Sequence, residues 1–180
     1  TTRHGVRASA SSAYLRPARR RANLRVETGA LATRICFDGL RATGVEYLQH
    51  GQRHSSRARC EVIVAAGAIN TPQLLQLSGV GPAGALTALQ LPLVLDSPAV
   101  GQHLQDHLCI DYVYRSRVPT LNNQLGPWPA KLWAGLQYLT TRRGPLALSV
   151  NQGGGFCRSS EELAHPDMQL YFSPLSYQRA

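Results

Sequence analysis

Two histidines and an aspartate in the stretch 103–107 have side chains suited to metal binding or acid–base catalysis. His103 and His107 are four residues apart, so a helix would present both imidazoles on one face, as a zinc site requires. Asp106 would face elsewhere on such a helix and no zinc motif supplies a third ligand, so we expect no metal site. A histidine can also act as a general base, because it titrates near neutrality. The alternative that we favour is a structural hydrogen bond between Asp106 and His107.

The four cysteines are a second set of reactive groups, and their spacing excludes the common cysteine sites. Cys36, Cys60, Cys109 and Cys157 lie far apart without any C-x-x-C pair. That spacing excludes the usual zinc and thioredoxin motifs and gives no disulfide framework. We therefore expect buried free thiols in a reducing compartment and a cytoplasmic location, with peripheral attachment to the inner membrane left open.

The segment 61–81 has the order of elements by which α/β folds bind phosphate groups. Its run from Val62 to Ala66 is short, apolar and rich in β-branched residues, which predicts a strand buried on both faces. Gly67 ends this run and a helix is predicted to follow. A strand, a glycine turn and a helix in this order bring backbone amides against a nucleotide phosphate.

The helix of this segment has signals at both ends. Asn70 or Thr71 is predicted to cap it, with Pro72 at the first helical position, where the missing N–H costs nothing. Ser78 and Gly79 are predicted to end it, because glycine tolerates a left-handed C-terminal turn.

The same residues resemble the second signature of the glucose–methanol–choline (GMC) oxidoreductases, FAD-dependent enzymes that oxidise alcohols. Every constrained position of the pattern is filled in Gly67-Ala68-x-x-Thr71-Pro72-x-Leu74-Leu75-x-x-Ser78-Gly79-Val80-Gly81. The alternative is an ordinary strand–turn–helix unit of another doubly wound protein. The resemblance extends over essentially the whole chain, as the middle portion of a longer enzyme.

The resemblance implies three residues near the FAD cofactor. The family uses the backbone of the residue at Ala32 to hold the adenine ring; the alternative is an ordinary strand residue. Gly67 lets the chain approach the cofactor closely because it has no Cβ, unless it is a simple turn glycine. Ala66 is its weaker companion. The stretch 100–107 resembles a family motif that lies near the flavin, although His103 replaces the usual asparagine.

The resemblance implies no catalytic residue in this chain. The family's catalytic histidine and its partner belong to a C-terminal region that these residues do not match. The chain begins at Thr1 rather than at methionine, and we expect an internal fragment that is inactive alone. The intact enzyme is expected to transfer hydride from the CH–OH group of choline or another primary alcohol to flavin. Its electron acceptor is not predicted.

A meander of three strands is predicted to position the first of these residues. Alternating apolar and polar residues predict strands at 23–28, 32–37 and 42–48, with Asp38-Gly39 as a hairpin turn. Residues 49–59 are polar and predict a loop or hairpin tip. This arrangement resembles the antiparallel sheet that many FAD-binding folds insert before their last parallel strand.

The remaining elements follow from periodicity and turn residues. The sequence predicts helices at 11–17, 82–91 and 132–139, strands at 93–95, 111–116 and 166–172, and a loop at 119–129. Leu86 and Leu89 are expected on one helical face. Together these features predict an α/β (α+β) chain. Residues 1–108 would be part of an FAD-binding doubly wound domain with an inserted antiparallel meander, and 109–180 the start of an antiparallel-sheet substrate domain.

Composition narrows the alternatives. The net charge is +9, but the N-terminal arginine run contains only Tyr14 as an aromatic residue and no nucleic-acid motif, so no nucleic-acid partner is expected. No run approaches the roughly 18 apolar residues of a transmembrane helix. Two other readings stay open: a non-catalytic arginine-rich binding module, and the remnant of a decayed gene.

Overall fold

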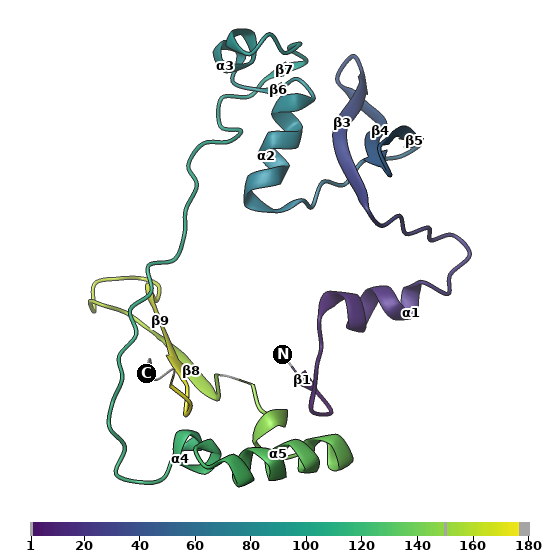
Figure 1. Cartoon of the computed structure of the whole chain (residues 1–180). Helices are drawn as coiled ribbons and strands as arrows, with labels where there is room; N and C mark the ends of the chain where they lie inside the picture. Colours follow the sequence, from purple (N-terminus) through teal and green to yellow (C-terminus); the bar gives the residue numbers. More distant parts are fainter. Residues whose placement is uncertain (1, 150, 177–180) are drawn as a thin grey trace. The chain divides into compact units, whose positions relative to one another are not determined.

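The computed structural model describes residues 2–149 and 151–176, and their contacts divide the chain into two units (Figure 1). The sheet unit is Val26–Cys109, and the split unit joins Thr1–Arg25 to Ile110–Ala180. The predicted site residues Ala32, Ala66 and Gly67 all belong to the sheet unit.

An antiparallel meander forms the sheet of the sheet unit. Its strands are β3 (Ala30–Asp38), β4 (Arg41–Gln49) and β5 (Gln52–Arg57), in the order β3-β4-β5. The prediction of a three-stranded meander is confirmed, but one of its strands was misplaced. Residues 23–28 form no strand, and the predicted loop 49–59 contains β5 instead.

The misplaced strand has a physical explanation at the second hairpin. His50 and Gly51 both have positive φ, at 52° and 77°, which is the two-residue turn whose twist matches an antiparallel pair. This turn pairs β5 with β4 although every residue of β5 is polar and exposed. The segment 23–28 pairs with no strand among the described residues; the Gln49 side chain donates to Glu27 Oε2 and to the Thr28 C=O instead.

That helix is α2 (Gly67–Leu77), which begins earlier than predicted. Pro72 lies inside α2 and not at its first position. Thr71 contributes to the N-terminal end all the same, because its Oγ1 accepts a hydrogen bond from the Ala66 N–H at 3.1 Å. The C-terminal end is as predicted: Ser78 is the C-cap, and Gly79 follows with φ of +93°.

The run from Val62 to Ala66 is not a strand, which corrects the prediction of a strand buried on both faces. A strand exists through hydrogen bonds to a neighbour, and no described segment pairs with this run. Ile63 is consequently 79% exposed. The sequence pattern predicted a buried environment that the described residues do not provide.

A small parallel pair follows α2. Its strands are β6 (Val80–Gly81) and β7 (Leu95–Asp96), joined through α3 (Ala83–Ala88). The predicted helix is confirmed with shorter bounds, and Leu86 is buried at 1% exposure. Leu89 is exposed, so it does not share the buried face as predicted. Residues 102–116 contain neither helix nor strand, which contradicts the predicted strand at 111–116.

The split unit contains helices and two hairpins. The predicted helix at 11–17 is confirmed as a π-helical turn, η1 (Ser11–Leu15), that continues into α1 (Arg16–Ala18). Later come α4 (Leu121–Leu125), α5 (Trp128–Thr141) and the 3₁₀ turn η2 (Pro145–Ala147). The hairpins pair β1 (Thr2–Arg3) with β2 (Val6–Arg7), and β8 (Gly153–Cys157) with β9 (Met168–Phe172).

Two elements of the split unit differ from prediction, and the first difference has a local cause. The predicted loop at 119–129 contains α4, because Thr120 and Asn123 form a reciprocal capping box that starts it. Helix α5 confirms the predicted helix at 132–139 and is longer on both sides. In the described ranges, no helix combines the length and the apolar character needed to cross a membrane.

Candidate functional site

The backbone of Ala32 faces the open edge of the meander. The two-residue turn His50–Gly51 makes Gln49 and Gln52 a hydrogen-bonded pair, and backbone groups then alternate in direction along β4. By this alternation Tyr47 points its N–H and C=O toward β5. Ala32 lies opposite Tyr47, so its own N–H and C=O point away from β4.

A hydrogen bond from the same edge supports this orientation independently. Ile35 lies opposite Val45, which also points its backbone groups toward β5, so Ile35 is likewise expected to face the open edge. The Ile35 N–H does so, donating to Ser78 Oγ at 2.8 Å. Ser78 has no solvent exposure, and its hydroxyl donates in turn to the Leu74 C=O. The open edge of β3 is thus tied to the C-terminal end of α2 at one point.

Ala66 and Gly67 lie at the other end of α2. Ala66 is the N-cap and Gly67 the first helical residue, and both are exposed. Gly67 has φ of +91°, a conformation that glycine adopts without strain, and a Cβ built on it would meet no atom within 4 Å. The first N–H groups of a helix have no partner within it and carry the positive end of its dipole. This end of α2 is therefore chemically suited to an anion.

The sheet edge and the helix start lie toward the same end of the sheet unit. Helix α2 contacts β3 and runs beside it in the same direction (Figure 1). From the Ile35–Ser78 bond, Ala32 lies three residues back, about 10 Å along β3. Gly67 lies eleven residues back from Ser78, about 16 Å along α2. Ala32 and Gly67, the two predicted cofactor contacts, therefore both lie on the N-terminal side of the Ile35–Ser78 hydrogen bond.

The stretch after residue 99 packs against the same helix. Gln76 Nε2 donates to the Val100 C=O at 3.0 Å, and Gly101 lies close to the Gln76 side chain. A hollow of about 300 Å³ lies between α2 and this stretch, with Pro72 and Gln102 among its lining residues. The first residues of the stretch 100–107 thus lie against the signature helix.

The histidines of this stretch form no site. His103 and His107 are exposed in a segment without helix, so the i,i+4 helical arrangement does not occur. The backbone N–H of His107 donates to Asp106 Oδ1 at 2.8 Å, which is a local bond and not a pairing of the two side chains. Within residues 2–149 and 151–176, no group of three or more histidine, cysteine, aspartate or glutamate side chains could hold a metal ion.

The cysteines are free but not buried. Cys60 and Cys109 are exposed, and Cys36 and Cys157 are half-buried. The prediction of free thiols is confirmed and the prediction of buried ones is wrong. Cys60 lies between β5 and α2, just before the apolar run 62–66, in which Ile63 is also exposed.

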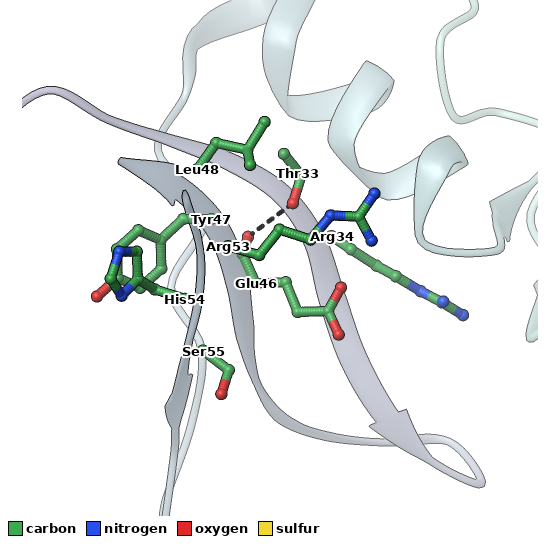
Figure 2. Close-up of a pocket in the computed structure, with 8 residues that line it drawn as sticks. All are labelled: Thr33, Arg34, Glu46, Tyr47, Leu48, Arg53, His54 and Ser55. Carbon is green, nitrogen blue, oxygen red and sulfur yellow. Dashed lines mark hydrogen bonds between the residues drawn. The ribbon is translucent and has the colours of Figure 1, made fainter. Parts of the chain in front are cut away.

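A second hollow, of about 470 Å³, lies over the meander and was not predicted (Figure 2). Thr33 and Arg34 of β3, Glu46 of β4 and Arg53 of β5 line it. Thr33 Oγ1 donates to the Glu46 C=O at 3.2 Å, the dashed line of Figure 2. No sequence motif marks these residues, because they come together only through the register of the strands.

Comparisons with known proteins agree with the resemblance found in the sequence. A family model described as GMC oxidoreductase matches residues 1–109. Human mitochondrial choline dehydrogenase is 46% identical over 176 residues, which cover 97% of this chain and 29% of the relative. The oxygen-dependent choline dehydrogenase of Burkholderia ambifaria is 43% identical over 180 residues, covering 97% of this chain and 31% of the relative. The chain thus spans about 30% of the length of these curated relatives.

Solved structures resemble the chain as well. A formate oxidase of Aspergillus oryzae has a TM-score of 0.80 at 22% identity, covering 97% of this chain and 34% of that one. A fungal aryl-alcohol oxidase has a TM-score of 0.74 at 27% identity, covering 85% and 27%. An FAD-dependent oxidoreductase of Chaetomium thermophilum has a TM-score of 0.66 at 30% identity, covering 77% and 24%. These likenesses confirm the predicted fold class.

Proposed function

Because this chain belongs to the GMC oxidoreductase family, we propose that it is part of an FAD-dependent enzyme that oxidises the CH–OH group of an alcohol. The bound flavin would accept the hydride from the alcohol carbon. The observation in the fold that carries this proposal is that one unit contains both an open sheet edge at Ala32 and an exposed helix start at Gly67.

The sheet edge and the helix start suit two different parts of a dinucleotide. The N–H and C=O of Ala32 offer one donor and one acceptor, which suits the edge of an adenine ring. Gly67, with Ala66 before it, offers close backbone approach and the positive end of a helix dipole, which suits the charged part of the cofactor. The residues present therefore fit FAD, and their share of the work is to bind and orient it.

The names of the relatives support choline as the proposed substrate. Two relatives more than 40% identical to this chain carry the name choline dehydrogenase, so choline or another primary alcohol is the proposed donor. The family match ends at residue 109, which supports a division into a cofactor-binding part at 1–108 and the start of a substrate domain at 109–180. Free thiols favour a reducing compartment, here proposed to be the cytoplasm.

The test uses the full-length protein that contains this chain. We expect it to purify with the absorption spectrum of oxidised flavin and to lose that absorption when choline is added without oxygen. Gly67→Ala is expected to lower the FAD content, because it strains the helix start and puts a methyl group into the space for the cofactor. Gly51→Ala is the matched control, since Gly51 also has positive φ and open space around it but lies in the β4–β5 turn.

Two results would contradict the proposal. A full-length protein that binds no flavin would remove the cofactor assignment. An equal loss of FAD in the Gly67→Ala and Gly51→Ala variants would show that the effect is general strain, and would remove Gly67 from the site.

A further inference from the structure

A β-bulge lies next to Ala32 on β3. The register places Ala32 opposite Tyr47 and Arg34 opposite Glu46, so Thr33 is an extra residue on β3. A bulge of this kind inserts one residue into one strand, leaves its partner unchanged and re-aims the groups around it. It occurs here directly beside the proposed adenine contact.

The bulge explains how Ala32 and Ile35 both face the open edge. In a regular strand, backbone groups alternate between the two edges, so residues that share an edge are an even number of positions apart. Ala32 and Ile35 are three positions apart. Their shared orientation therefore requires the extra residue, Thr33. In an unbulged strand with the Ile35–Ser78 bond kept, Ala32 would turn its N–H and C=O toward β4.

The Thr33 side chain holds the bulge. Its Oγ1 donates to the C=O of Glu46, the residue that the two bulge residues face together. Thr33 is half-buried, and its side chain lies with those of Arg34 and Glu46 around the same hollow (Figure 2). A threonine suits this position because it is β-branched, as strands favour, and its hydroxyl adds a bond that valine cannot form.

We propose that Thr33 is a positioning residue for the cofactor, which turns the N–H and C=O of Ala32 toward the open edge by holding the bulge. The inference rests on the proposed binding of FAD. The ligand chemistry is a planar heteroaromatic edge with a ring nitrogen that accepts and an amino group that donates, as adenine has. One outward-facing backbone residue presents the complementary acceptor and donor.

The chain supplies a matched control in a second bulge. Thr43 is an extra residue on β4, between the pairs Cys36–Gly44 and Phe37–Ala42. Its Oγ1 donates to the Cys36 C=O at 3.3 Å, so it holds its bulge as Thr33 does. This bulge lies beyond Ile35 and cannot change the direction of Ala32. Thr43→Val thus removes the same kind of bond from the same sheet without the proposed effect.

The experiment measures the discrimination between two flavin dinucleotides. Full-length protein is stripped of flavin, and dissociation constants are measured by flavin fluorescence for FAD and for the analogue with hypoxanthine in place of adenine. Hypoxanthine carries a carbonyl where adenine carries its amino group and an N–H where the ring nitrogen of adenine accepts, so both hydrogen bonds to Ala32 are lost. We expect wild type to prefer FAD by at least about tenfold, because each of the two lost hydrogen bonds contributes about 1 kcal/mol.

Thr33→Val is expected to weaken FAD binding about tenfold and to reduce the preference to less than about threefold. Thr33→Ser, which keeps the hydroxyl, and Thr43→Val are expected to stay within about twofold of wild type in both quantities. Circular dichroism checks the fold of each flavin-free variant. If Thr33→Val is unfolded, Thr33→Ala replaces it with the same expected result.

The outcomes separate this inference from the proposed function. If wild type binds FAD and the Thr33 variant keeps the wild-type preference, the positioning role of Thr33 is wrong while the enzyme assignment stands. If wild type binds neither dinucleotide, the proposed function itself fails. Equal loss of preference in Thr33→Val and Thr43→Val would assign the effect to the sheet in general and also overturn the inference.

Discussion

Substitution of Ser78 by alanine tests how the signature helix is held against the meander. The Ser78 hydroxyl is fully buried and joins two backbone groups: it accepts from the Ile35 N–H at 2.8 Å and donates to the Leu74 C=O. Ile35 is itself only 3% exposed, so water cannot replace the lost partner. The serine thus satisfies a donor on a sheet edge that has no neighbouring strand among the described residues.

The magnitude follows from which group is left without a partner. After Ser78→Ala, the Leu74 C=O still accepts the backbone N–H of residue 78 at 3.1 Å, so this acceptor stays satisfied. The Ile35 N–H does not, and a buried unsatisfied donor costs about 1–3 kcal/mol. We expect the local opening free energy of β3 to fall by about 2 kcal/mol, which corresponds to exchange about 30-fold faster.

Hydrogen–deuterium exchange with mass spectrometry measures this change on peptides that cover β3, in the full-length protein. Ser55→Ala is the matched control, because Ser55 lies exposed on β5 and its substitution is expected to stay within about 0.5 kcal/mol. The reasoning would be refuted if exchange of β3 in Ser78→Ala stayed within about twofold of wild type, or if Ser55→Ala changed it equally.

Two further predictions concern backbone and charge. Gly51→Ala, with φ of +77° and no atom within 4 Å of the new Cβ, is expected to cost about 1–2 kcal/mol. Gly79→Ala should cost at least about 3 kcal/mol, because its Cβ would also lie 2.6 Å from the Pro92 carbonyl oxygen; equal urea midpoints would contradict this. The pKa of Asp167 is lowered from 3.8, first by the hydroxyl of Ser159 and then by its N–H, because both donate to the carboxylate. The ionised Asp167 therefore stabilises the fold above pH 3.8, and this stabilisation is lost as the pH falls through the lowered pKa. Ser159→Ala should raise that pKa, as carboxyl NMR titration would show, and an unchanged titration would remove the assigned cause.

Local chemistry was predicted best from the sequence. The turn at Asp38-Gly39 was found because glycine adopts the positive φ that such a turn needs, and Gly39 has φ of +56°. The helix end at Ser78 and Gly79 was found for the same reason. The start of α2 was misplaced, because proline is most frequent at a first helical position and Pro72 lies inside this helix instead.

The residues of the candidate site also differ in how far the sequence alone predicted them. Gly67 lies in a pattern of fixed residues that resembles a GMC signature, within the range 1–109 that the family model matches. Ala32 came only from the resemblance, because a contact through backbone atoms places no demand on the side chain. The Thr33 bulge left no mark in the sequence at all. It arises from the register between β3 and β4, which at the bulge pairs residues twelve and fifteen positions apart.

The run from Val62 to Ala66 shows why strands are harder to predict than turns. Its β-branched residues suit a strand covered on both faces, yet Ile63 is 79% exposed and no described segment pairs with the run. A turn needs only its own residues, whereas a central strand needs a neighbour on each side. This chain spans about 30% of the length of its curated relatives, so those neighbours are expected from sequence outside the 180 residues. In the full-length protein, amide exchange across 62–66 should therefore be slow, and fast exchange there would show that the pattern does not mark a buried strand.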